Sequence, residues 1–91
     1  MLLALSAVHR NALVTALTRS GWPVIGVRGF DEALRRLGES GARGALVDLR
    51  DEGKAGLVAV RALSGRTRVL AIVPGRDLKW ITDAIDAGAT Q

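Results

Sequence analysis

The sequence has no cysteine and no tyrosine, and its aromatic residues are two tryptophans and one phenylalanine among 91 residues. Without cysteine, the chain has neither a disulfide framework nor a thiolate metal site. Its core must therefore consist of Leu, Val, Ile and Ala, within a hydrophobic content of 48%. This composition predicts one domain at most and favours a folded globular chain over a disordered one.

Long apolar runs are also missing. The opening stretch, residues 1–7, has no basic region in front of its apolar residues. Its apolar run is shorter than the roughly 7–15 residues of a secretion signal. No other stretch is long enough to span a bilayer. We therefore expect a cytoplasmic protein that has no membrane partner.

Acidic residues are fewer than basic ones, nine against thirteen, which gives a net charge of +4. A basic chain raises the question of nucleic-acid binding. The arginines, however, are spread along the chain and cluster only at 35–36 and 66–68. We expect a solvated arginine-rich surface, and keep a small basic nucleic-acid-binding α/β domain as a further alternative.

Strand-like and helix-like patterns alternate four times along the chain. Short apolar or β-branched runs predict strands near residues 2–6, 24–27, 45–49 and 69–73. Apolar stripes at helical spacing predict helices near residues 10–19, 30–37, 57–63 and 78–87. The polar stretch 50–56 is expected to be a loop. This alternation predicts βαβ units, a parallel sheet and right-handed crossovers.

The turn after the first strand contains no glycine. A dinucleotide or phosphate loop needs glycine there, so neither is expected. Ser6, His9 and Asp48 are a conceivable hydrolytic triad, but the strained glycine turn that carries a reactive serine is missing. A single histidine without cysteine does not favour zinc. We predict that the chain is not an enzyme.

Asp48 stands near the end of the apolar run 45–49. The run is typical of a strand buried on both faces of a parallel sheet. Burying a carboxylate there costs free energy unless a neighbouring group pairs with it or a ligand binds it. Ligands of open α/β sheets bind at the carboxyl ends of the strands, so Asp48 is the leading site candidate.

Three stretches carry a family resemblance: 44–49 with Gly56-Leu57 behind it, 29–34 before the second helix, and 84–89 at the end of the fourth. With their mutual spacing they resemble the receiver domain of two-component response regulators. The resemblance implies an α/β, flavodoxin-like (CheY-like) three-layer fold with a parallel sheet of order 2-1-3-4(-5). Four βα units are present in residues 1–91, which we expect to be one receiver-like domain lacking its last strand and helix. We expect this domain to be the N-terminal part of a longer signalling protein.

The resemblance also implies roles for single residues. Asp48 falls at the phosphoacceptor position. The acidic pair that holds Mg²⁺ in the family is replaced by Ser6 and Ala7, and Val73 takes the switch position of a hydroxyl residue. Trp80 falls near the face on which receivers dock partners, and tryptophan is favoured at interfaces.

We therefore predict a pseudo-receiver. It would act through protein–protein interaction or dimerisation, without a cofactor and with impaired or absent Mg²⁺-dependent phosphorylation of Asp48. Asp48 would be a structural acid paired with His9, Arg10 or Arg50. The alternative is a working phosphoaccepting receiver that binds Mg²⁺ in an atypical pocket. The partners expected are a histidine kinase or output domain and a second copy of the chain, with no direct contact to nucleic acid.

Overall fold

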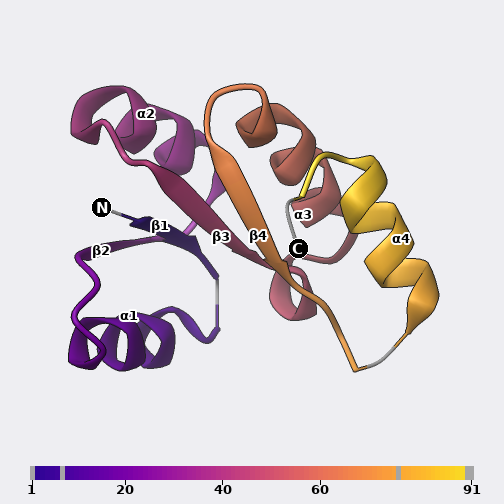
Figure 1. Cartoon of the computed structure of the whole chain (residues 1–91), viewed down its shortest axis with the longest axis horizontal. Helices are drawn as coiled ribbons and strands as arrows, with labels where there is room; N and C mark the ends of the chain where they lie inside the picture. The colour runs from indigo at the N-terminus through magenta and orange to yellow at the C-terminus, as the bar shows by residue number, and fades with distance from the viewer. Residues whose placement is uncertain (1, 7, 76, 90–91) are drawn as a thin grey trace.

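The computed structural model describes residues 2–6, 8–75 and 77–89, in which strands and helices alternate along the chain (Figure 1). The elements are β1 (Leu2–Leu5), α1 (Arg10–Arg19), β2 (Val24–Val27), α2 (Phe30–Ser40), β3 (Gly44–Asp48), α3 (Leu49–Ser64), β4 (Arg68–Ile72) and α4 (Leu78–Asp86). Within these residues, no helix combines the length and the apolar character needed to cross a membrane.

The strands form one parallel sheet in the order β2-β1-β3-β4. This order confirms the flavodoxin-like fold class predicted from the sequence. Leu5 at the end of β1 is in register with Val47 of β3, so the residues that follow the two strands come out side by side. Ser6 therefore lies next to Asp48, although 42 positions separate them.

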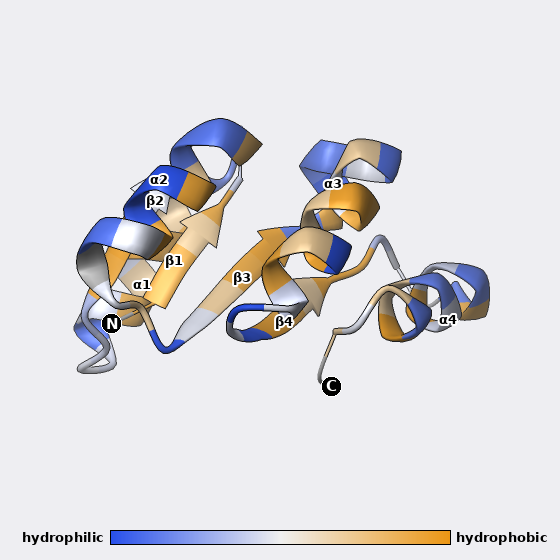
Figure 2. Ribbon diagram, turned by 90° about the horizontal axis from the view of Figure 1, so that it is seen from above, coloured by the Kyte–Doolittle hydropathy of each residue, from blue (hydrophilic) through white to orange (hydrophobic). Residues whose placement is uncertain are grey.

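The core lies between one face of the sheet and the helices α2 and α3. Alternate strand residues such as Leu3, Leu5 and Val47 are buried on this face because successive side chains of a strand point to opposite sides. Leu37 of α2 and Leu63 of α3 join the same cluster. In Figure 2 the strands are largely hydrophobic, whereas each helix carries both hydrophobic and hydrophilic residues.

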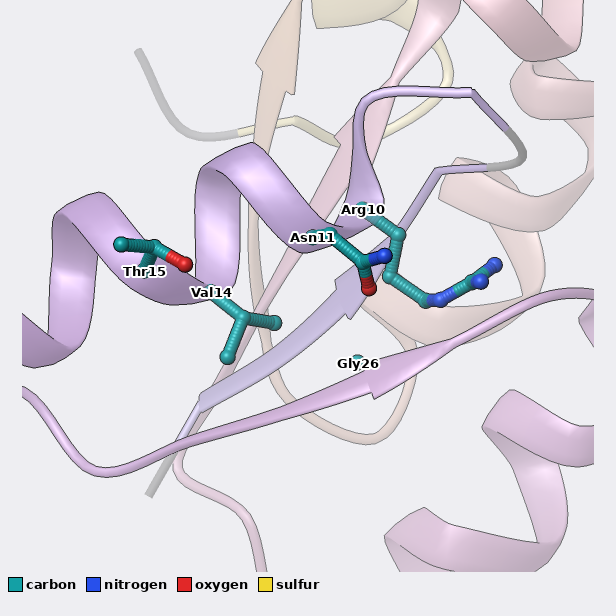
Figure 3. Close-up of a pocket in the computed structure, with 5 residues that line it drawn as sticks. All are labelled: Arg10, Asn11, Val14, Thr15 and Gly26. Carbon is teal, nitrogen blue, oxygen red and sulfur yellow. The ribbon is translucent and has the colours of Figure 1, made fainter.

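Helix α1 lies against the opposite face of the sheet, over β2. Gly26 allows this close approach, because a Cβ there would come within 2.7 Å of Arg10 Cγ and 3.0 Å of Val14 Cγ2. Figure 3 shows Arg10 and Val14 on the side of α1 that faces Gly26. The helix α1, the sheet and the pair α2 and α3 make the three predicted layers.

The polar stretch 50–56 is helical, so the predicted loop is wrong. Helix α3 begins at Leu49, directly after β3, and Asp48 caps it by accepting a hydrogen bond of 3.0 Å from the Arg50 N–H. Gly53 interrupts the helix with φ 58° and ψ −136°. With the cap at Asp48 and the break at Gly53, the first turn of α3 can consist of polar residues. Because these residues have no apolar stripe, the sequence pattern did not predict that they are helical.

Helix α4 packs on α3 rather than over the sheet. Ser64 of α3 donates a hydrogen bond of 3.3 Å to the Ala87 carbonyl, next to Gly88, where a Cβ would collide with Ser64. Ala84 is buried, whereas Leu78 and Ile85 of the predicted apolar stripe are exposed. Asp77 caps α4, since its carboxylate accepts from the Lys79 N–H at 2.9 Å.

Candidate functional site

Asp48 is fully buried at the carboxyl end of β3, and Arg50 holds it in a two-pronged ion pair. Arg50 Nε donates to Asp48 Oδ1 at 2.9 Å, and Arg50 Nη2 donates to Asp48 Oδ2 at 2.6 Å. The Arg50 side chain is 39% exposed, so the pair closes the site from the solvent side. The planar guanidinium matches both oxygens of the carboxylate at once, which makes this a strong type of pair.

A second carboxylate approaches the end of β1 from α3. Asp51 Oδ2 accepts hydrogen bonds from Ser6 Oγ at 2.5 Å, from the Val8 N–H at 3.0 Å and from the His9 N–H at 3.1 Å. Ser6 Oγ also lies 3.5 Å from Asp48 Oδ2 and accepts from the His9 N–H at 2.9 Å. One turn of α3 thus ties the β1–α1 connection to the β3 end.

His9 precedes α1 and directs its ring toward both carboxylates. Nδ1 is 2.8 Å from Asp51 Oδ1 and 3.7 Å from Asp48 Oδ2, while 44% of the side chain is exposed. The Ser6 hydroxyl donates to a carboxylate, and the near ring nitrogen of His9 faces Asp51. This is not the serine–imidazole contact that a hydrolytic nucleophile needs, even though Ser6, His9 and Asp48 do meet.

The hydrogen bonds of the site shift two pKa values. The bond from Ser6, together with those from His9 and Val8, holds the pKa of Asp51 well below its ordinary value, against the effect of desolvation. The bond to Asp48 raises the pKa of Arg50 above its ordinary value. Both shifts favour the charged forms of these two side chains.

The atoms that could bind a divalent ion at this site belong to one histidine and two aspartates. His9, Asp48 and Asp51 can each offer one ligand atom, and these atoms lie within 4.8 Å of one another. Mg²⁺, however, prefers carboxylate and water oxygens in near-octahedral geometry. Here Arg50 engages both oxygens of Asp48, and three donors engage one oxygen of Asp51. In this arrangement the residues do not fit Mg²⁺.

The other residues singled out from the sequence lie around this centre. Val73 follows β4 and is half-buried against the core, as is Trp80 of α4. Ala7, assigned to the lost acidic pair, lies outside the described residues. Three partners were proposed for Asp48. Arg50 forms the two-pronged ion pair, which we call the fork, and His9 Nδ1 lies 3.7 Å from Asp48 Oδ2. Arg10 Nη1 instead donates to the Ser6 carbonyl at 3.5 Å.

Sequence reasoning placed Asp51 in a loop after Asp48, as a weak candidate for a metal-binding oxygen, and did not predict its contacts with the end of β1. The signal was present in the spacing, because Asp48, Arg50 and Asp51 fall on a strand end and the first helical turn after it. A helix that starts at Leu49 brings residues two and three positions after Asp48 back over its carboxylate. The expectation of a loop at 50–56 hid this geometry.

No family model matches the chain, and no curated protein matches it in sequence. Solved structures do match it in fold. A response regulator from Thermotoga maritima has a TM-score of 0.81 at 23% identity, covering 98% of this chain and 79% of that one. A response regulator receiver protein from Pseudomonas putida has a TM-score of 0.79 at 22% identity, with the same coverage. A response regulator protein from Burkholderia pseudomallei, described with a phosphorylated aspartic acid, a calcium ion and citrate, has a TM-score of 0.79 at 25% identity. The match covers 97% of this chain but only 55% of that protein's chain.

Proposed function

Since the chain has the fold of the receiver domains of response regulators, as its sequence predicted, we propose that it is a receiver-like regulatory domain. It acts through contact with other proteins and catalyses no reaction of its own. Its Asp48 is held by an arginine of the same chain, and Mg²⁺-dependent phosphorylation is impaired or absent. The observation that carries this proposal is the fork between Arg50 and Asp48.

Two features of the site oppose phosphotransfer: the fork at Asp48 and the lack of a metal-binding carboxylate at Ser6. A carboxylate that attacks a phosphoryl group needs a free oxygen, and both Asp48 oxygens accept hydrogen bonds from Arg50. The attacking and transferred groups are also both anionic, so cations must bridge their oxygens. Ser6 offers a hydroxyl in the neighbourhood where a metal-binding carboxylate would serve, and its proton is directed at Asp51.

Intact-mass measurement with Mg²⁺ and acetyl phosphate tests this proposal. We expect no phosphoryl adduct on the native chain and slow labelling of Arg50→Ala, whose Asp48 oxygens are released. Arg61→Ala, which removes an exposed arginine of the same helix, is the matched control and should remain unlabelled. An adduct on the native chain that disappears in Asp48→Asn would show that phosphorylation is intact.

That outcome would favour the second candidate, a working receiver with an atypical pocket. Its support is the approach of His9 and Asp51 to Asp48, within metal-ligand spacing. In this case Arg50 must swing away from the carboxylate before the ion and the phosphodonor enter. A Mg²⁺-dependent change in tryptophan fluorescence of the native chain would accompany the adduct.

Trp80 is our candidate for the protein contact. It lines a pocket of about 200 Å³ between α3 and α4, together with Leu57, Lys54, Lys79 and Asp83. An indole beside an aliphatic side chain, with two lysines and one aspartate around them, suits a partner surface that carries an apolar side chain among polar residues. We propose this face as the contact for a histidine kinase, an output domain or a second copy of the chain.

A further inference from the structure

His9 is the single histidine of the chain, and a carboxylate holds its ring from one side. Nδ1 lies 2.8 Å from Asp51 Oδ1, while 44% of the side chain is exposed. Among the described residues, no group bonds to the other ring nitrogen, Nε2. The role proposed above for this chain gives this half-exposed imidazole no chemistry.

Asp51 fixes the tautomer of the His9 ring. Its Oδ2 accepts from the Ser6 hydroxyl and from the N–H groups of Val8 and His9. These bonds hold the pKa of Asp51 well below its ordinary value, so the carboxyl group is ionised in neutral solution. An ionised carboxylate only accepts hydrogen bonds, and Nδ1 must therefore carry the proton. In the neutral ring, the lone pair then belongs to Nε2.

This arrangement favours Nε2 as a nucleophile. A carboxylate bonded to one ring nitrogen of a histidine fixes the ring orientation and raises the basicity of the other nitrogen. It also balances the positive charge that the ring gains when Nε2 forms a new bond. Histidine is among the side chains that form covalent intermediates in this way.

The surroundings of His9 suit an anionic group. Helix α1 begins directly after His9, with no side-chain cap and no acidic residue in its first turn, so the positive end of its dipole is not neutralised there. Arg50 Nη2 lies 2.6 Å from Asp48 Oδ2, the same oxygen that lies 3.7 Å from His9 Nδ1. The Arg50 guanidinium thus offsets the negative charge of Asp48 beside the ring.

We propose that His9 is a phosphoacceptor, which takes a phosphoryl group on Nε2 from a donor whose phosphorus is bonded to a protonated nitrogen. The Nε2 lone pair attacks phosphorus, and the new N–P bond forms as the N–P bond of the donor breaks. The leaving nitrogen keeps the electron pair of the broken bond and departs as a neutral amine. The Nδ1 proton stays on the ring, bonded to Asp51. His9 is the reacting group, and Asp51 is a positioning residue.

Charge determines this class of donor. An acyl phosphate brings two negative charges and releases a carboxylate anion, so it depends on cations that bridge the oxygens. A phosphoramidate with a protonated nitrogen brings one net negative charge and releases neutral ammonia, so it requires no metal ion. This inference goes beyond the proposed function, because it concerns His9 and does not depend on the state of Asp48.

Intact-mass measurement with phosphoramidate and EDTA, at about pH 7.5 where an ordinary imidazole is mostly neutral, tests the proposal. We expect the native chain to gain one phosphoryl group about tenfold faster than N-acetylhistidine does at the same concentration. His9→Gln should gain none, since it removes the single histidine. The adduct should be labile to acid and resistant to hydroxylamine, as an N–P bond is. An acyl phosphate on Asp48 would instead require Mg²⁺ and would be cleaved by hydroxylamine, so the failures of the two proposals are distinguishable.

Variants of the aspartates test the positioning role. Asp51→Asn should slow the labelling about tenfold. Asp86→Asn makes the same chemical change at an exposed position of α4 and is the matched control, with the native rate expected. Circular dichroism verifies that both variants are folded. Nitrogen-15 NMR of the single imidazole gives a second measurement, in which the native ring should carry its proton on Nδ1 and Asp51→Asn should shift it toward Nε2, as in free histidine.

Three outcomes would overturn the proposal. The first is a native chain that is labelled no faster than N-acetylhistidine. The second is a native ring whose proton is on Nε2 in the NMR spectrum. The third is an Asp51→Asn variant that is labelled as fast as Asp86→Asn, which would remove the carboxylate from the reaction.

Discussion

Replacing Ser6 by alanine is the sharpest probe of the network around Asp48. Ser6 is fully buried, and its hydroxyl donates to Asp51 at 2.5 Å while accepting from the His9 N–H at 2.9 Å. Its contact with Asp48, at 3.5 Å, lies at the limit of hydrogen bonding. The alanine variant therefore removes one strong bond to a carboxylate, one ordinary bond and one marginal contact.

The geometry allows the cost to be worked out. A hydrogen bond to a charged group contributes about 1.5–3 kcal/mol to stability. Asp51 Oδ2 keeps two N–H donors, from Val8 and His9, so the variant leaves neither the carboxylate nor the His9 amide without a partner. We therefore expect a loss of about 2 kcal/mol in the free energy of unfolding. In a domain of this size, that lowers Tm by about 8–16 °C.

The loss should depend on pH in a defined direction. Ser6 is the largest cause that holds the pKa of Asp51 below its ordinary value. A carboxyl group with a lowered folded pKa stabilises the fold above its unfolded pKa, near 4, and loses that contribution as the pH falls toward the folded value. The difference between native and Ser6→Ala chains should be complete above about pH 5 and should shrink in more acidic solution.

Urea unfolding followed by circular dichroism between pH 3 and pH 7 measures both effects. The control is Ser20→Ala, which removes an exposed serine bonded to the Ala16 carbonyl and should cost less than about 0.5 kcal/mol. In the Asp51→Asn background, Ser6→Ala should cost less than it does in the native chain. A cost equal to that of Ser20→Ala, or one that is constant with pH, would refute the network described here.

Two further perturbations test the rest of the structure. Gly53→Ala places a Cβ at φ 58° and ψ −136°, a conformation that L side chains rarely adopt, and should destabilise the chain by about 1–3 kcal/mol in urea unfolding. An unchanged midpoint would mean that the break in α3 does not persist in solution. Trp80→Ala should lower the affinity for a kinase, an output domain or a second copy by about tenfold, measured by sedimentation or calorimetry. If the oligomeric state and every partner affinity are unchanged, the proposed contact at α4 is wrong.

The order of elements and the sheet topology were predictable because they follow from patterns of whole segments. The β-branched run at 24–27 is a strand, and so is the apolar run 45–49 except for Leu49, because their side chains fill a parallel sheet. Asp77 was predictable as a cap because a carboxylate before a helix can accept from its first amides. These inferences rely on residues that are close together in the sequence, so they do not depend on contacts between distant segments.

The site was harder to predict because it depends on one helix boundary. Polar residues after Asp48 were expected to form a loop, and only a helix beginning at Leu49 turns Arg50 and Asp51 toward the strand ends. The sequence did suggest Arg50 as a partner of Asp48, on charge alone. It could not show that Asp51 would receive Ser6 and two backbone amides, since 45 positions separate Asp51 from Ser6. Contacts at such separation come from register and not from periodicity.

The fork at Asp48 has a consequence for how the site responds to its surroundings. The cation of the fork is the Arg50 guanidinium, which belongs to a residue two positions after Asp48 in the same chain. Covalent geometry therefore fixes the effective concentration of this cation at the carboxylate. Dilution and chelators cannot remove it, and changes in the supply of free ions do not alter it. The positive charge that faces this buried carboxylate is therefore part of the chain itself, and a movement of Arg50 would withdraw it.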